Sequence, residues 1–201
     1  MSDPLHVDAG ELDFGDDLEA RADRNSGDGR PSQLLPVVRR HPETGVPTEG
    51  YLRWGLIPHD APTRPSIQPI HARAETLTEK AIFRDAYRRR RCIVPMNLFY
   101  VRDRHRKPHA FAVKDSPLFG VAGIWENWRD PKTDEWERTF ATVTVEANAL
   151  IAPLNDRMPA ILLREDYARW RATYAPQRRR TRIAPLTTIL KPTWLLSPKA
   201  E

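Results

Sequence analysis

The segment RDAYRRRRCIVP, residues 84–95, is informative about the fold because it passes from a helical pattern to a strand pattern within one short stretch. Over residues 82–89, apolar side chains fall on one helical face and charged side chains on the other. Thr76 and Glu79 match a capping box, which predicts that this helix starts at Thr76. Residues 88–91 would form its last turn, where arginines oppose the helix dipole, and residues 92–94 begin a strand that Pro95 closes.

Further strands are predicted on both sides of this junction, at residues 33–40, 51–58, 109–115, 119–128 and 138–148. The last is the clearest, because Ala141, Val143 and Val145 alternate with threonines. Residues 41–50 have the composition of an exposed hairpin loop, and apolar residues at helical spacing between Leu163 and Tyr174 indicate a late helix. Strands without a regular alternation of helices predict an α+β fold with a mixed or antiparallel sheet and scattered helices.

Length and composition predict one domain with two extensions. The 201 residues include 40% hydrophobic residues and 6 tryptophans, enough for a buried core. We divide the chain into an acidic N-terminal segment (1–30), a domain core (31–175) and a basic C-terminal extension (176–201). A single cysteine excludes an internal disulfide, and there is neither a secretory signal pattern nor an apolar run of the ~20 residues that span a bilayer. We expect a cytoplasmic monomer, nucleoid-associated if bacterial, with no membrane partner.

Metal and cofactor chemistry have little support in the sequence. His105 and His109 have the spacing of half a zinc-finger site, but one cysteine cannot supply the other half. The chain has no P-loop and no GxGxxG motif, so we expect no metal and no cofactor. Neighbouring arginines would favour the thiolate of Cys92, but this residue opens an apolar strand and has no obvious histidine partner. A core cysteine is therefore favoured over an activated thiol.

Nucleic acid is the partner that the charge pattern favours. The formal net charge is +5, and arginines recur next to aromatic residues, as in Arg53–Trp54 and in Arg102 after Phe99 and Tyr100. Arginine binds phosphates in a bidentate manner and aromatic rings stack on unpaired bases, so single-stranded DNA or RNA is indicated. Charge runs are also common on solvated surfaces, and composition alone leaves both interpretations of the arginine run open.

A family resemblance rests on seven segments that occur in order: LLPVVRR, RWGLIP, HARAET, FRDAYRRRRCIVP, FGVAGIWENW, TVTVEAN and NDRMPAIL. Over residues 31–170 the chain resembles the SRAP family (SOS response-associated peptidases). The resemblance implies a single domain with a barrel-like core and a positively charged groove for single-stranded DNA. It also implies a role in DNA repair, in which an N-terminal cysteine captures the aldehyde of an abasic site as a thiazolidine DNA–protein crosslink.

The chain departs from the family pattern at every position that the resemblance assigns to this chemistry. Ser2 stands at the cysteine position, and His71 stands at the asparagine of an N-A-R-A-E motif. Val101 stands at the glutamate of a G-[FW]-[YF]-E-W motif, and Asn155 at the histidine of an H-D-R-M-P motif. Val101 cannot carry a proton and Asn155 cannot titrate, so we expect efficient cross-linking and self-release to be lost. The resemblance also makes the arginine run a helix-to-strand junction, with Cys92 structural.

The positions that the chain retains suit binding. Arg73 and Arg157 match motif arginines that resemble phosphate contacts. Five further positions also match: Trp54, Pro58, Glu75, Phe99 and Tyr100. The predicted DNA-binding set consists of Arg73, Arg157, Trp54, Phe99 and Tyr100.

Two alternatives remain open. In one, the protein is an active abasic-site enzyme in which the α-amine of Ser2 forms a Schiff base with the aldehyde and His71 moves protons. In the other, the acidic residues 8–23 cover the basic groove or dock a protein partner, because carboxylates compete with phosphates for the same guanidiniums.

Overall fold

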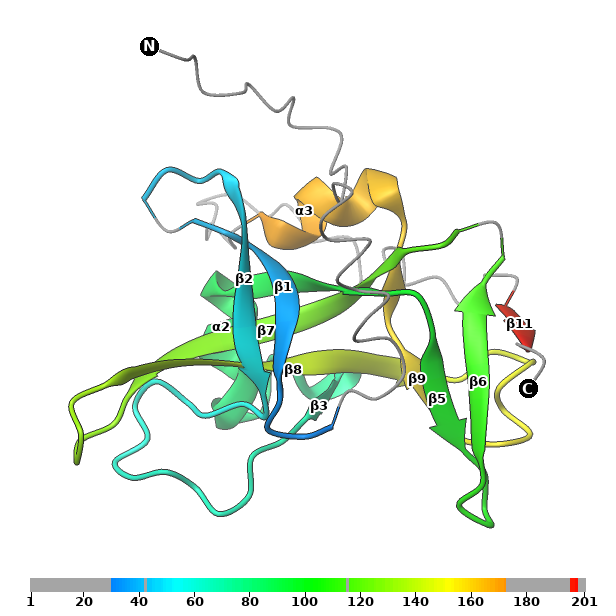
Figure 1. Cartoon of the computed structure of the whole chain (residues 1–201), viewed down its shortest axis with the longest axis horizontal. Helices are drawn as coiled ribbons and strands as arrows, with labels where there is room; N and C mark the ends of the chain where they lie inside the picture. Colours follow the sequence, from blue (N-terminus) through cyan, green and yellow to red (C-terminus); the bar gives the residue numbers. More distant parts are fainter. Residues whose placement is uncertain (1–29, 42, 115, 173–195, 199–201) are drawn as a thin grey trace.

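A closed barrel of five strands forms the centre of the computed structural model, which describes residues 30–41, 43–114, 116–172 and 196–198 (Figure 1). In order around the barrel, the strands are β1 (Leu34–Arg40), β2 (Pro47–Trp54), β8 (Trp136–Glu146), β7 (Phe119–Arg129) and β4 (Arg91–Met96), and β4 returns to β1. All these pairings are antiparallel except the parallel pairing of β2 with β8. The predicted α+β class with a mixed, barrel-like sheet is confirmed.

Shorter elements extend the barrel. β3 (His71–Arg73) runs parallel to β8, β9 (Arg157–Pro159) is antiparallel to β8, and β10 (Ile161–Leu162) is antiparallel to β7. A second sheet contains β5 (Phe99–Arg102), β6 (Pro108–Val113) and β11 (Leu196–Pro198). The helical segments described are η1 (Ala74–Thr76), α2 (Ala81–Arg89), η2 (Arg164–Asp166) and α3 (Tyr167–Arg171).

Two apolar clusters pack the barrel against the second sheet and against the helices. The inner cluster takes side chains from all five barrel strands and from β5 and β6; it includes Val37, Leu52, Cys92, Val101, Phe111, Trp125 and Phe140. The outer cluster joins the other face of the barrel to the helices; it includes Val38, Ile93, Ala122, Ala141, Tyr87 and Trp170. Successive residues of a strand point to opposite faces, so neighbours such as Val37 and Val38 enter different clusters.

The helix after η1 starts at Ala81 and not at Thr76, so the capping-box prediction is wrong. The Thr76 hydroxyl donates to the carbonyl of Arg73 at 3.4 Å, and the Thr76 carbonyl accepts from the amides three and four residues further on. These contacts close a separate turn ahead of the helix. Thr76 therefore satisfies groups of that turn, and α2 begins without a side-chain cap.

Arg91 belongs to β4 and not to the last turn of α2, which ends at Arg89. Its guanidinium lies 5.4 Å from the ring centre of Tyr87 and 5.5 Å from that of Trp170, and it donates to a backbone carbonyl at the end of α3. Burial lowers the pKa of Arg91. The arginines at residues 88–91, which the sequence predicts in one helical turn, are therefore divided between α2 and β4. Arg91 connects α3 to the barrel through its hydrogen bond and its ring contacts.

The predicted strand at residues 51–58 is shifted in the structure, because β2 begins earlier and ends at Trp54. Arg40 pairs with Pro47, which confines the turn to residues 41–46 of the predicted loop 41–50.

Near the C-terminus, the predicted late helix is shorter, since α3 ends at Arg171, and Tyr174 lies outside the described residues. Residues 196–198 of the C-terminal extension form β11 and pair with β6. Among the described residues, no helix is long and apolar enough to cross a membrane.

Candidate nucleic-acid interface

The candidate site lies on the carboxyl-terminal half of β8, where strands pair on both sides. On one side, β3 places His71 opposite Thr142 and Arg73 opposite Thr144. On the other side, β9 carries Arg157. Neighbouring strands are ~4.8 Å apart, so two arginines from distant parts of the sequence come to flank one strand.

Arg157 is held by a carboxylate and by a backbone carbonyl. Its Nη1 and Nη2 atoms each donate to one oxygen of Glu75 at 3.0 Å, and Nη2 also donates to the carbonyl of Thr144 at 2.7 Å. The Arg157 side chain is 21% exposed and that of Glu75 is 53% exposed. The hydrogen bond from Arg157 holds the pKa of Glu75 below its ordinary value, and the charge of the exposed Arg73 adds to this effect. Thr144 thus orients the guanidinium, while Glu75, the anionic partner of Arg157, is accessible from solvent.

His71 is part of a short hydrogen-bonded chain. Its Nδ1 lies 2.7 Å from the hydroxyl oxygen of Thr142, and that hydroxyl donates to the carbonyl of Ile70 at 3.2 Å. Since the hydroxyl proton goes to Ile70, we infer that Nδ1–H donates to Thr142 and that Nε2 is the acceptor nitrogen. Desolvation lowers the pKa of His71, which favours the neutral imidazole. The ring of Trp54 meets His71 edge-on, with ring centres 5.6 Å apart.

Asn155 joins the site to the β5–β6 hairpin. Its Oδ1 accepts from the backbone amide of Arg157 at 2.9 Å, and its Nδ2 donates to the carbonyl of Arg102 at 3.2 Å. One contact uses the amide oxygen as an acceptor and the other uses the amide nitrogen as a donor, so neither contact requires an ionisable side chain. Asn155 therefore positions the strand that carries Arg157.

The side chains of β5 alternate between the core and solvent. Val101 is 5% exposed and lies in the inner cluster, so no polar group occupies this family position. Phe99 is 6% exposed and stacks on Phe111 with ring centres 5.8 Å apart, so it supports the strand from the core. Tyr100 is 51% exposed and presents its ring to solvent. Of the two predicted aromatic residues on this strand, only Tyr100 is therefore accessible from solvent.

Two other predicted positions lie apart from this surface. Cys92 is fully buried in the inner cluster, where desolvation raises the pKa of its thiol. A Cβ on Gly123 would come 2.8 Å from the Cys92 sulfur, which shows how tightly the thiol is packed. Ser2 lies outside the described residues.

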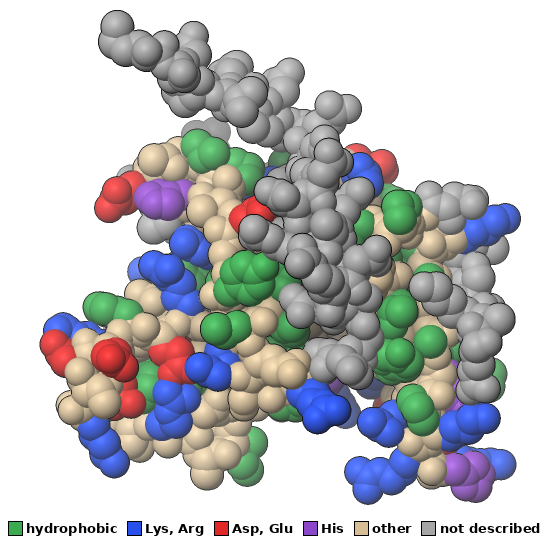
Figure 2. Space-filling view, viewed as in Figure 1, with side chains coloured by type: hydrophobic (Ala, Val, Ile, Leu, Met, Phe, Trp, Pro, Cys, Tyr) green, Lys and Arg blue, Asp and Glu red, His purple; other side chains and the backbone are tan. Residues whose placement is uncertain are grey.

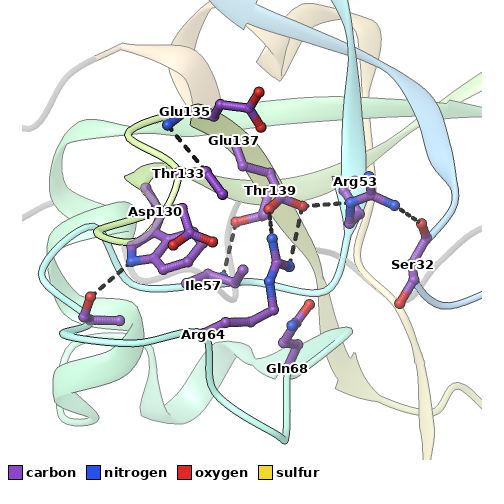
Figure 3. A network of polar contacts seen from close by, with 12 residues as sticks. Ser32, Arg53, Ile57, Arg64, Gln68, Asp130, Thr133, Glu135, Glu137 and Thr139 are labelled. Atoms are coloured by element: carbon purple, nitrogen blue, oxygen red, sulfur yellow. Dashed lines mark hydrogen bonds and ion pairs between the residues drawn. The ribbon is translucent and has the colours of Figure 1, made fainter.

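A network of charges holds the loop between β2 and β3 (Figure 3). Glu137 on β8 binds both Arg53 on β2 and Arg64 in the loop. At the end of the loop, Trp54 donates from Nε1 to the carbonyl of Ile70 at 2.9 Å. The segment that leads into β3 is thus fixed at two points, and Trp54 serves this loop as well as the site.

Sequence reasoning did not identify Glu75, Thr142 and Thr144 as partners of the site residues. The threonines were visible as the polar half of an alternating strand, but the strands on either side of them were not. In the described part of the chain, no group of three or more His, Cys, Asp or Glu side chains is arranged to hold a metal ion.

Comparison with known proteins finds one family model and several relatives with related descriptions. A family model described as SOS response associated peptidase (SRAP) matches residues 7–193. The chain is 38% identical over 158 residues to the abasic site processing protein YoqW of Bacillus subtilis (strain 168), covering 69% of this chain and 70% of that protein. It is 27% identical over 136 residues to the abasic site processing protein HMCES of Xenopus tropicalis, covering 55% of this chain and 41% of that protein.

Solved structures agree with this comparison. A crystal structure of a protein from Bacteroides thetaiotaomicron has a TM-score of 0.68 and 27% identity, covering 85% of this chain and 75% of that one. A second, from Bordetella bronchiseptica, has a TM-score of 0.66 and 25% identity, covering 86% and 87%. With a family model that matches most of its length, a closed barrel and the retained motif arginines, this chain belongs to the SOS response associated peptidase (SRAP) family.

Proposed function

We propose that this protein binds single-stranded DNA at abasic sites in the DNA damage response. The observation that carries the proposal is the placement of Arg73 and Arg157 on either side of β8, with the Arg157 guanidinium oriented by the Thr144 carbonyl. Exposed or half-buried rings of Trp54 and Tyr100 offer surfaces for unpaired bases. The relatives named as abasic site processing proteins support the same substrate class.

The proposal includes loss of the cysteine-based cross-link. The sequence has Ser2 in place of the family's cysteine, and Val101 places a buried apolar side chain where the family has a glutamate. The two polar atoms of Asn155 are engaged in positioning β9 and the hairpin. A surface that retains the family's arginines but lacks the family's glutamate and histidine is better suited to binding DNA than to forming the cross-link.

A second candidate function is supported by His71. In this reading the α-amine of Ser2 attacks the aldehyde carbon of the opened sugar, a carbon–nitrogen bond forms and water leaves. The Nε2 atom of a neutral His71 would take the proton that the amine loses and return it to the departing oxygen. The support for this role is the contact of Nδ1 with Thr142, which leaves Nε2 as the acceptor.

Binding is tested by fluorescence anisotropy with single strands that carry a stable abasic analogue, over a range of salt concentrations. We expect log K to fall linearly with log salt, and Arg157→Ala to reduce the slope by about 0.7, the value for one phosphate on a single strand. Arg84→Ala, on the exposed face of α2, is the matched control and should leave the slope unchanged. Undetectable binding at low salt, or equal affinity for duplex and single strands, would remove the proposal.

The two functions separate in intact-mass measurements after incubation with abasic single-stranded DNA. If the protein only binds, borohydride should trap slow lysine adducts that Ser2→Ala does not change. If the Ser2 amine reacts, a borohydride-dependent adduct should form quickly and disappear on N-terminal acetylation, and His71→Gln should slow it. A fast, heat-stable adduct formed without borohydride would contradict both functions.

A further inference from the structure

The tip of the β5–β6 hairpin is a strongly basic feature outside the candidate site. Residues 102–109, RDRHRKPH, hold four Lys or Arg residues and one carboxylate, a net charge of +3. Arg104, Arg106 and Lys107 are exposed. Figure 2 shows Lys, Arg and His side chains gathered at the free end of this hairpin.

The single carboxylate of the tip is used inside the hairpin. Oδ1 of Asp103 accepts from the amides of His105 at 2.8 Å and Lys107 at 3.0 Å, and Oδ2 lies 3.0 Å from Nε2 of His109. The contact with His109 holds the pKa of Asp103 below its ordinary value, and the two amides add to this. Asp103 therefore organises the turn, and the cations around it are left to face solvent.

The backbone of the tip is closed in one conformation. The Asp103 amide donates to the carbonyl of Lys107 at 3.0 Å, and the Arg106 amide donates to the carbonyl of Asp103 at 2.9 Å. Arg106 has φ of 65°, a left-handed conformation that glycine or asparagine adopts more easily. Its carbonyl accepts from Nη1 of Arg102 at 3.1 Å. The cations are thus presented on an ordered turn, which reduces the entropy that a ligand must remove on binding.

The hairpin begins at the candidate site. The carbonyl of Arg102 receives the hydrogen bond from Asn155, whose other end orients the amide of Arg157. Tyr100, two residues before Arg102, is on the same face of β5 and is exposed. A strand rises roughly 3.3 Å per residue, so the tip lies on the order of 10 Å beyond Arg102, a length comparable to about three nucleotides at 3.4 Å each.

We propose that the hairpin tip binds the phosphates of the DNA strand on one side of the abasic site. The inference rests on the proposed function and specifies where the flanking strand runs. Residues 102–107 contain no apolar side chain that a bilayer could take up, and continuity with Arg157 through Asn155 favours the same nucleic acid over a separate acidic protein. Arg104 and Lys107 supply the charge, and Asp103 holds them in place.

The test compares two double variants that lose the same charge. Arg104→Gln with Lys107→Gln alters the tip, and Arg84→Gln with Arg88→Gln alters the exposed face of α2. Binding is measured with three oligonucleotides that carry the abasic analogue: one short, one extended by several nucleotides on the 5′ side and one extended on the 3′ side. For one of the two extensions, we expect the tip variant to lower the salt slope by about 1.4 and the affinity at 0.1 M salt by about 25-fold, the effect of two phosphate contacts.

The results for the short oligonucleotide and for the α2 variant show whether the tip binds a flanking strand specifically. The short oligonucleotide should bind the wild type and the tip variant equally, and the α2 variant should match the wild type throughout. If the tip variant behaves like the wild type on every oligonucleotide, or weakens all three equally, the tip does not hold a flanking strand. Tip-dependent binding of anionic vesicles or acidic peptides, without an effect on the extended strands, would also overturn the inference. If the wild type binds none of the three, it is the proposed function that fails.

Discussion

Replacement of Glu75 by glutamine should make the protein bind single-stranded DNA more tightly. Glu75 accepts from both terminal nitrogens of Arg157 at 3.0 Å, so a phosphate must displace this carboxylate before it can take the guanidinium. Glutamine keeps an acceptor oxygen but removes the competing charge. Thr144 still receives its hydrogen bond from Arg157 at 2.7 Å, so the guanidinium remains oriented.

The magnitude follows from the ion pair that the phosphate no longer has to displace. The salt slope should stay close to that of the wild type, because Arg157 contacts one phosphate in both proteins. An exposed ion pair is worth up to about 1 kcal/mol, so the affinity should rise by up to about 5-fold. The cost in stability should be small, below about 1 kcal/mol, because Glu75 is 53% exposed and exposed ion pairs contribute little. The affinity gain is therefore expected to appear in a protein that is still fully folded.

Anisotropy titrations at several salt concentrations measure the slope, and a thermal melt checks the fold. Glu79→Gln is the matched control, because Glu79 is exposed, lies four residues away and loses the same charge. If Glu75→Gln binds no more tightly than the wild type, Glu75 does not compete with phosphate for Arg157. If Glu79→Gln produces the same gain, the effect is a general change of net charge and not a release of Arg157.

Gly120→Ala should lower the free energy of unfolding by about 1–3 kcal/mol, because the new Cβ would lie 2.7 Å from the Tyr167 hydroxyl in a packed core; Gly50→Ala, whose nearest atom would be 3.8 Å away, should be close to neutral in the same denaturant titration. Cys92 should not react with a thiol reagent in the native protein, since it is fully buried and its pKa is raised; labelling faster than unfolding would contradict this burial. Burial raises the pKa of Glu126, although Nη2 of Arg90 lies 2.7 Å from its carboxylate. The free energy of unfolding of the wild type, relative to that of Glu126→Gln, should therefore fall as the pH rises from the pKa of Glu126 in the unfolded chain through its pKa in the folded protein. A flat difference across that range, in melts at stepped pH, would argue against the raised value.

The class of the protein and much of its local structure could be predicted from the amino-acid sequence alone. The alternation around Val143 predicts a strand, and the structure has β8 there. Residues 84–95 predict a helix followed by a strand, and the structure has α2 followed by β4. Short motifs in a fixed order indicated the SRAP family, which the comparisons confirm. These features could be read because amphipathic periodicity and motif spacing are local properties of a chain.

Which residues share the site depends on contacts between distant parts of the chain and could not be predicted from local sequence. Arg157 and Glu75 are 82 residues apart, and they meet because β3 and β9 both pair with β8. The parallel pairing of β3 with β8 is a long-range contact without a signature in local periodicity. The boundary error at Arg91 also involves a distant contact, because its guanidinium lies against the ring of Trp170. The error at Thr76 is local, because its hydroxyl donates to a carbonyl three residues earlier in the chain. The periodicity of apolar residues can be read directly from a short segment of sequence. The pairing of distant strands depends on how the whole core packs.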